Sequence, residues 1–248
     1  MTMSKRITDS KIIKSDSLTE KQRDDFIEKL YFVHSKIFSG IDQQTFRAYI
    51  FNKKATSQKI ILFYDKITVI GYCAVHFFRI TADDTYHVIR AEAGILPEYR
   101  GNSPLVKFMF WEIYKHALRH RFRDVYYLGT LVHPSSYHNF HKFCDVIYPS
   151  FKQETPQVIF HKIQTLIQYL SIKLKGPIEE MTCEVGWITR ESVEEQLRWQ
   201  QREEDDIRYF LKMNPAYREG FGLITLIPCT FTNLLNVLIN LFKNRIMK

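Results

Sequence analysis

EAGILPEYRGNSPLVKFMFWEIYKHALRH, residues 92–120, carries the strongest structural signal in this chain. It reads as an apolar strand, a polar turn over residues 97–104 and a long amphipathic helix. A helix start presents unpaired backbone N–H groups and the positive end of the helix dipole, so it attracts phosphate. Arg100 adds a permanent charge, and Gly101 lets a ligand approach the backbone. The turn could therefore hold a pyrophosphate, or it could be an ordinary well-capped helix start.

The part of this segment from Ile95 to Ala117 resembles the acyl-CoA-binding motif of the GCN5-related N-acetyltransferase (GNAT) superfamily. In that family a strand ends in a short apolar-Pro-Glu-Tyr-Arg-Gly segment, and the following helix end receives the coenzyme A pyrophosphate. The resemblance extends over residues 18–150 in the order of elements and rests on this one specific motif. It implies an α/β fold, with a mixed, mostly antiparallel sheet flanked by helices. It also implies acyl transfer from coenzyme A to an amine.

The resemblance further implies which residues bind the acyl-CoA. Backbone groups of Ile95 and Leu96 would pair with the pantetheine arm. The pyrophosphate seat would comprise Arg100, Gly101, Asn102 and Ser103. The family pattern expects small, flexible residues where this chain has Ser103 and Leu105. Pyrophosphate binding could survive on the remaining amides, or the pocket could be retained without catalysis.

Acyl transfer from a thioester to an amine needs a base, an acid and a donor for the carbonyl oxygen. The family often uses a Glu on the binding strand as base, and Glu92 lies on that strand, eight positions before Arg100. A purely structural strand Glu is the alternative. The family's usual acid is a Tyr on the short helix after the next strand, but Phe143 stands at that position. Tyr137 and His133 are close by and could substitute, or each could be structural.

His116 and His120 are four positions apart on the expected helix, a spacing that could bind a metal. We find no carboxylate or cysteine at a useful spacing beside them, so we expect a solvated helix face and no metal. The four cysteines are far apart and show no zinc-ligand spacing. They are expected to be reduced thiols in a cytosol-like compartment.

The composition favours a folded protein with an anionic ligand. Among 248 residues, 45% are hydrophobic and 15% aromatic, and the net charge is +8. We find no signal peptide and no apolar run long enough for a membrane span. No basic run interleaved with aromatics makes nucleic acid the leading partner. We expect a cytoplasmic protein whose partners are an acyl-CoA, such as acetyl-CoA, and an unidentified amine.

We divide the chain into four segments of one domain. Residues 1–16 form a polar lead, and residues 17–150 form the acyl-CoA-binding core. Residues 151–230 add inserted helices and the last strands, including one strand over 183–189 and one charged helix over 191–212. Residues 231–248 form an amphipathic helix that places Asn233, Asn236, Asn240 and Lys243 on one face. This helix could pack on the domain, mediate a homodimer or lie on a membrane surface.

Two alternatives to an acetyltransferase stay open. One is a catalytically inactive module of the same fold that senses a ligand or binds a protein. A cleft blocked by the aromatic side chains of residues 108–114 would favour it. The other is a long-chain N-acyltransferase at a membrane surface, which a large apolar cavity beside the binding strand would favour.

Overall fold

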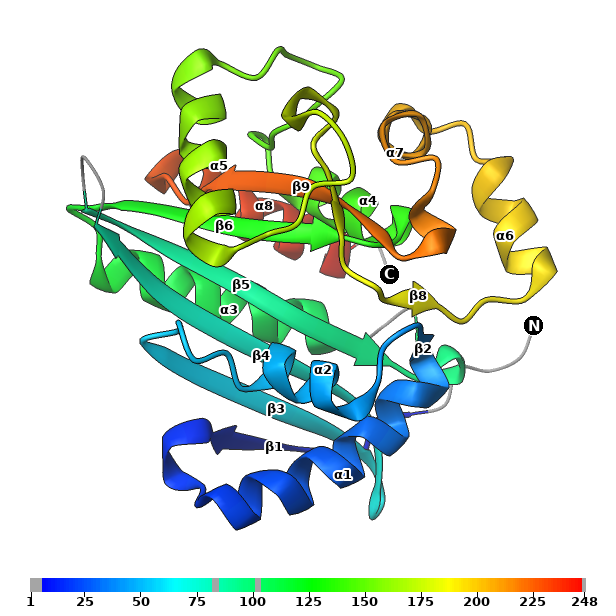
Figure 1. Cartoon of the computed structure of the whole chain (residues 1–248). Helices are drawn as coiled ribbons and strands as arrows, with labels where there is room; N and C mark the ends of the chain where they lie inside the picture. The colour runs from blue at the N-terminus through cyan, green and yellow to red at the C-terminus, as the bar shows by residue number, and fades with distance from the viewer. Residues whose placement is uncertain (1–5, 82–84, 101–103, 247–248) are drawn as a thin grey trace.

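The computed structural model describes residues 6–81, 85–100 and 104–246, and its centre is a twisted sheet (Figure 1). Seven strands of the described chain form this sheet in the order β1-β3-β4-β5-β6-β9-β7. Their bounds are β1 (Asp9–Lys14), β3 (Ser57–Asp65), β4 (Thr68–Thr81), β5 (Thr85–Ile95), β6 (Asp124–Leu131), β7 (Thr182–Glu184) and β9 (Phe221–Pro228). Neighbouring strands pair antiparallel except β5 and β6, which are parallel. The predicted mixed, mostly antiparallel sheet is confirmed.

Helices cover both faces of the sheet (Figure 1). One face carries α1 (Glu20–Ile37), α2 (Gln43–Ile50) and α5 (Gln157–Leu170). The other carries α3 (Pro104–Arg119), α4 (Pro134–Phe143) and α8 (Phe231–Ile246). Two short helices, α6 (Val193–Gln200) and α7 (Asp205–Met213), lie near the small β2 (Phe38–Ser39) and β8 (Ile188–Thr189) pair. Single 3-10 turns occur at Ser15–Ser17, Pro97–Tyr99, Ile178–Glu180 and Tyr217–Glu219.

The first helix begins where the sequence signal places it. Thr19 is the N-cap of α1, and its side chain accepts a hydrogen bond from the Gln22 amide. Gln22 in turn accepts one from the Thr19 amide, which completes a capping box. Ile27, Leu30 and the rest of the apolar stripe of α1 are buried against the sheet. This stripe fixes α1 on one face, over the strand that carries the candidate site.

The polar lead contains a strand that the sequence did not predict. β1 pairs with β3 from Asp9–Tyr64 to Lys14–Lys59. Its residues are exposed or half-buried, so it has no apolar alternation for a sequence pattern to detect. Backbone hydrogen bonds to the sheet edge hold it in place.

Two predicted elements of residues 151–230 are each divided. The expected helix 191–212 is α6 and α7, separated at residues 201–204. Four consecutive acidic residues, 203–206, repel one another within a helix and are better placed at a new helix start, where the dipole favours them. The expected strand 183–189 is broken at Gly186, whose φ of +80° is not a strand conformation. Its two ends pair with different strands, β9 and β2.

The last helix packs on the domain through its asparagine face and through the buried Leu234 and Val237. Asn233 is buried, donates to the carbonyls of Val146 and Pro228, and accepts from the Asp145 amide. The contact with the loop after α4 is therefore polar, while Phe231 and other apolar side chains of α8 are exposed. In the described chain, no helix is long and apolar enough to cross a membrane.

Candidate acyl-CoA site

The candidate site lies where β5 and β6 diverge, beyond Ile89 and Tyr127, and this divergence is called the opening. The two strands pair over only four positions, from Tyr86–Asp124 to Ile89–Tyr127. Beyond these positions β5 continues beside β4, and β6 continues beside β9, so the two strands diverge (Figure 1). Each strand then has a sheet partner on one side only. A ligand that carries amide groups can pair with these inner edges, because strand edges present backbone N–H and C=O groups.

A charged pair bridges this opening. Arg90 on β5 donates to Glu92 Oε1 at 3.4 Å and to Thr130 Oγ1 on β6 at 3.2 Å. The Arg90 and Glu92 side chains are only 11% and 12% exposed. Burial raises the pKa of Glu92, and the nearby Arg90 guanidinium only partly opposes this rise. A carboxylate with a raised pKa is a better proton acceptor near neutral pH, which is what a general base needs.

Tyr49 on α2 lies close enough to Glu92 to interact with its charge. The sequence analysis did not identify this residue. Burial, with a smaller contribution from the charge of Glu92, raises the pKa of Tyr49 to about 12. Its hydroxyl donates to the Val185 carbonyl at 2.9 Å. Tyr49 comes from a region with no motif, and only packing places it here. Trp187 packs edge-on against Tyr49, so the chain after β7 covers this side of the opening.

Arg100 is held at the turn before α3, but its partners are protein groups. Its guanidinium lies 3.5 Å from Glu195 and donates to the Arg190 carbonyl at 3.4 Å. The turn is fixed to β3 because the Tyr99 hydroxyl donates to Asp65 at 2.6 Å. Gly101, Asn102 and Ser103, predicted to complete the seat, lie outside the described residues. Of the predicted seat, the described structure contains Arg100 and the first turn of α3.

The predicted pantetheine contacts are already engaged in backbone bonds. Ile95 pairs with Gly71 in β4. The Leu96 amide donates to Ile70 at 2.9 Å, and its carbonyl accepts from Tyr99 at 3.0 Å. Leu105 lies half-buried in the first turn of α3. Pairing of pantetheine with Leu96 would require these bonds to be exchanged.

The two predicted acids are held in bonds typical of structural residues. Tyr137 is fully buried, its hydroxyl donates to the Pro149 carbonyl at 2.9 Å, and burial raises its pKa. His133 is the N-cap of α4, where Nδ1 accepts from the Ser135 amide at 3.1 Å. Its Nε2 contacts the Glu191 carboxylate. Within the described residues, no hydrogen bond links either side chain to Glu92.

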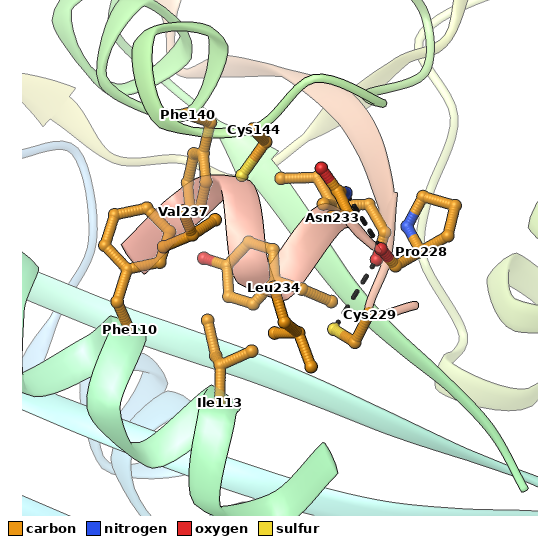
Figure 2. A pocket seen from close by; sticks show the side chains of 11 residues that line it. Phe110, Ile113, Phe140, Cys144, Pro228, Cys229, Asn233, Leu234 and Val237 are labelled. Atoms are coloured by element: carbon orange, nitrogen blue, oxygen red, sulfur yellow. Dashed lines mark hydrogen bonds between the residues drawn. The ribbon is translucent and has the colours of Figure 1, made fainter. Parts of the chain in front are cut away.

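Aromatic side chains fill the space between α3 and α4. Phe110 contacts Phe140 and Phe143 edge-on, with ring centroids 5.8 and 5.5 Å apart. Figure 2 shows the small apolar cavity that remains between these rings and α8, which contributes Leu234 and Val237. Its volume of about 20 Å³ is close to what one water molecule needs. This cavity cannot hold a long acyl chain, so it gives no support to the long-chain alternative.

Comparisons with known proteins give partial overlaps with acyltransferases. No family model matches this chain, and no curated protein matches it. A conserved protein of unknown function from Enterococcus faecalis, described as a probable N-acyltransferase, matches with 11% identity and a TM-score of 0.35. That match covers 55% of this chain and 32% of the Enterococcus chain.

Two further matches are complexes with the cofactor. The catalytic domain of the Tetrahymena GCN5 histone acetyltransferase with coenzyme A has 12% identity and a TM-score of 0.38, over 61% of this chain and 82% of that one. Arabidopsis thaliana NAA60 with acetyl-CoA has 15% identity and a TM-score of 0.38, over 58% and 89% of the two chains. At these values the overlap is partial, and the function proposed below rests on the geometry of this chain.

Proposed function

We propose that this protein transfers an acyl group, acetyl in the first instance, from an acyl-CoA thioester to an amine. The observation that carries the proposal is the divergence of β5 and β6, with the buried Glu92 beside Arg90, which contacts Thr130 on β6. A thioester arm needs a strand edge to pair with, and an amine nucleophile needs a base. The opening offers both within one strand.

The proposed reaction uses Glu92 as the general base. The ammonium proton passes to the Glu92 carboxylate, directly or through water, and the neutral amine attacks the thioester carbonyl. The C–N bond forms and the attacking nitrogen gives its second proton to solvent, while the C–S bond breaks and the leaving thiolate takes a proton from solvent. Arg90 keeps Glu92 oriented through the 3.4 Å contact. The bonds of Tyr137 and His133 are the reason that we assign the thiolate proton to solvent.

The phosphates would bind at the first turn of α3. The contact of Arg100 with Glu195 joins two side chains that are 28% and 29% exposed, and partly exposed ion pairs of this kind are weak. A pyrophosphate carries more negative charge than one carboxylate and also interacts with the helix dipole. It would therefore displace Glu195 from Arg100. The weak ion pair between Arg100 and Glu195 would therefore occupy the proposed seat until the pyrophosphate displaces it.

Calorimetric titration of the purified chain with coenzyme A, acetyl-CoA and a long-chain acyl-CoA tests this function. We expect binding of acetyl-CoA and an affinity about tenfold lower for Arg100→Ala, because one charge-assisted phosphate contact contributes about 1.5 kcal/mol. Arg121→Ala, which removes an exposed arginine beyond the far end of α3, is the matched control. No binding at millimolar ligand, or equal losses in the two variants, would contradict the proposed seat.

A non-catalytic module of the same fold is the second candidate. Aromatic packing by residues 108–114 would favour this candidate. Phe110 is one of these residues, and its ring fills the space beside α4. The two candidates differ in thiol release. With acetyl-CoA and a panel of small amines and peptides, an enzyme releases free coenzyme A thiol faster than the amine-free sample does. A module that binds acetyl-CoA with no amine-dependent release is the non-catalytic one.

A further inference from the structure

Three histidines meet at the end of α3 that is farthest from the proposed phosphate seat. His116 lies on the last turn of α3, and the chain turns at His120 directly after it. His87 comes from β5, where the strand pairs with Arg79 of β4 and Val125 of β6. One ring nitrogen from each histidine lies within 4.8 Å of the others. The helix spacing alone showed two of these residues, and the third comes from a strand almost 30 positions earlier.

The three rings are packed together and are not on a solvated helix face, which corrects the expectation from sequence. All three residues are half-buried. The rings of His87 and His120 stack with centroids 3.8 Å apart, and His116 stacks on Phe77 at 4.5 Å. Within the described residues, no ring nitrogen of the three makes a hydrogen bond, and the buried Nε2 of His116 has no partner. A buried ring nitrogen without a partner costs free energy unless something binds it.

Burial, together with the cations nearby, favours the neutral form of the His87 and His116 rings. Burial, and then the charges of neighbouring residues, lower the pKa of His116 to about 3, and the pKa of His87 is lowered for the same reasons. The cations that act on these two rings are Lys59, Arg79, Arg119 and Arg123. The carboxylate one turn before His116, Glu112, is bonded to Lys59 and Lys115. Neutral imidazole is the form that donates a lone pair to a metal.

We propose that His87, His116 and His120 form a binding site for one divalent transition-metal ion, with zinc as the preferred ion. Imidazole nitrogens suit zinc, copper and nickel, and three protein ligands with one open position are a common arrangement for zinc. Tetrahedral bonds of 2.0–2.1 Å place ligand nitrogens about 3.4 Å apart. The rings therefore need to close by at most about 1.4 Å from their 4.8 Å limit, which side-chain rotation can supply.

The surrounding cations determine what fills the fourth position. Three neutral imidazoles leave the full charge of the ion uncompensated, and the nearby arginines and Lys59 add to it. An anionic fourth ligand, such as hydroxide, carboxylate or phosphate, lowers this repulsion. The ion would also join the end of α3 to β5; Glu92 lies toward the other end of β5, and Arg100 lies in the turn that precedes the other end of α3.

Cobalt binding tests this site directly, because tetrahedral Co²⁺ has a visible d–d absorption that hydrated Co²⁺ lacks. The chelator-treated full chain is titrated with Co²⁺, and bound cobalt is then displaced with Zn²⁺. We expect one cobalt per chain with the tetrahedral band, and loss of the band on zinc addition. His87→Phe, which keeps an aromatic ring in the stack, and His120→Asn should each weaken cobalt binding at least tenfold. His161→Asn, at an exposed position of α5, is the control and should bind like the wild type.

Thermal unfolding distinguishes a variant that has lost metal binding from a variant that has failed to fold. Zn²⁺ should raise the Tm of the wild type and of His161→Asn, and should leave the Tm of His120→Asn unchanged, because an ion raises the Tm only of a folded state that binds it. His120 follows the end of α3, so its variant is expected to fold even if His87→Phe does not. No tetrahedral band in the wild type, or equal cobalt binding by His120→Asn and His161→Asn, would overturn the proposal. Neither readout depends on acyl transfer.

Discussion

Glu92 on β5 and Glu112 on α3 are both largely buried, and their pKa values move in opposite directions. Glu92 shares the strand alternation of Gly94, which faces Ile37 of α1, whereas α3 covers the other face of the sheet (Figure 1). Burial raises the pKa of Glu92, and one guanidinium at 3.4 Å does not cancel that effect. Burial also acts to raise the pKa of Glu112. There, hydrogen bonds from Lys115 and Lys59, the latter at 2.7 Å, outweigh it and lower the pKa.

The difference between the two sites is the number and closeness of the cationic partners. Two close ammonium groups hold Glu112 as a stable carboxylate, which is suited to binding α3 to β3. Glu92 has one distant partner and keeps an affinity for protons, which is suited to proton transfer. A buried Glu is therefore assigned a chemical or a structural role by its neighbours and not by its burial.

The largest effect that separates the two carboxylates is expected in catalysis. Glu92→Gln removes the proposed base, so kcat/KM for acyl transfer should fall about 100-fold or more. Glu112→Gln, on the other face, should keep turnover near the wild-type level. Thiol release from acetyl-CoA with an accepted amine measures both. Equal activity of wild type and Glu92→Gln would remove Glu92 from the mechanism.

Stability should show the reverse order. Glu112→Gln leaves Lys59 and Lys115 without their charged partner, and we expect a loss of about 2 kcal/mol in the free energy of unfolding. Both lysines are partly exposed, which limits the loss. Glu92→Gln loses one long contact and should cost less than about 1 kcal/mol. Urea denaturation followed by circular dichroism checks this order, and a larger loss for Glu92→Gln would contradict the comparison.

The two variants should also differ in the sign of their pH dependence. The pKa of Glu112 is lowered, so its contribution to stability is present above its ordinary value of 4.5 and is lost as pH falls through the folded-state pKa. The pKa of Glu92 is raised, so its contribution is present below 4.5 and is lost as pH rises through the folded-state pKa.

Urea denaturation of wild type and both variants between pH 3.5 and pH 7 measures these slopes. The stability of wild type minus that of Glu112→Gln should increase with pH. The corresponding difference for Glu92→Gln should decrease with pH. Slopes of the same sign would mean that the two carboxylates do not differ as described.

A third carboxylate extends the comparison to the surface and should give the smallest effect. Glu195 is partly exposed and pairs with Arg100 at 3.5 Å. Glu195→Gln keeps the capping box of α6 and releases Arg100, so coenzyme A should bind about threefold more tightly. Glu194→Gln, its exposed neighbour, is the control for net charge. Calorimetry that shows weaker binding for Glu195→Gln would place Glu195 on the ligand side of the seat.

Local sequence patterns were sufficient to predict most elements of the fold. The capping signal of α1, the β-branched runs of β3 and β4, and the apolar segment of β5 followed by a helix all depend on near neighbours in the chain. The turn before α3 and the placement of Glu92 on β5 follow from the same segment. Patterns of this kind are readable because burial of one helix face or one strand face repeats at a fixed period.

Contacts between distant segments settled the rest, because no local pattern encodes them. β1 is held by an edge rather than by a buried face, so no apolar period marks it. Folding placed Tyr137 in the core and Glu195 beside Arg100. It also brought His87 to His116 and His120, because β5 and α3 lie side by side only in the folded sheet. The number of partners around each buried charge depends on this packing, and so does the chemistry of the site.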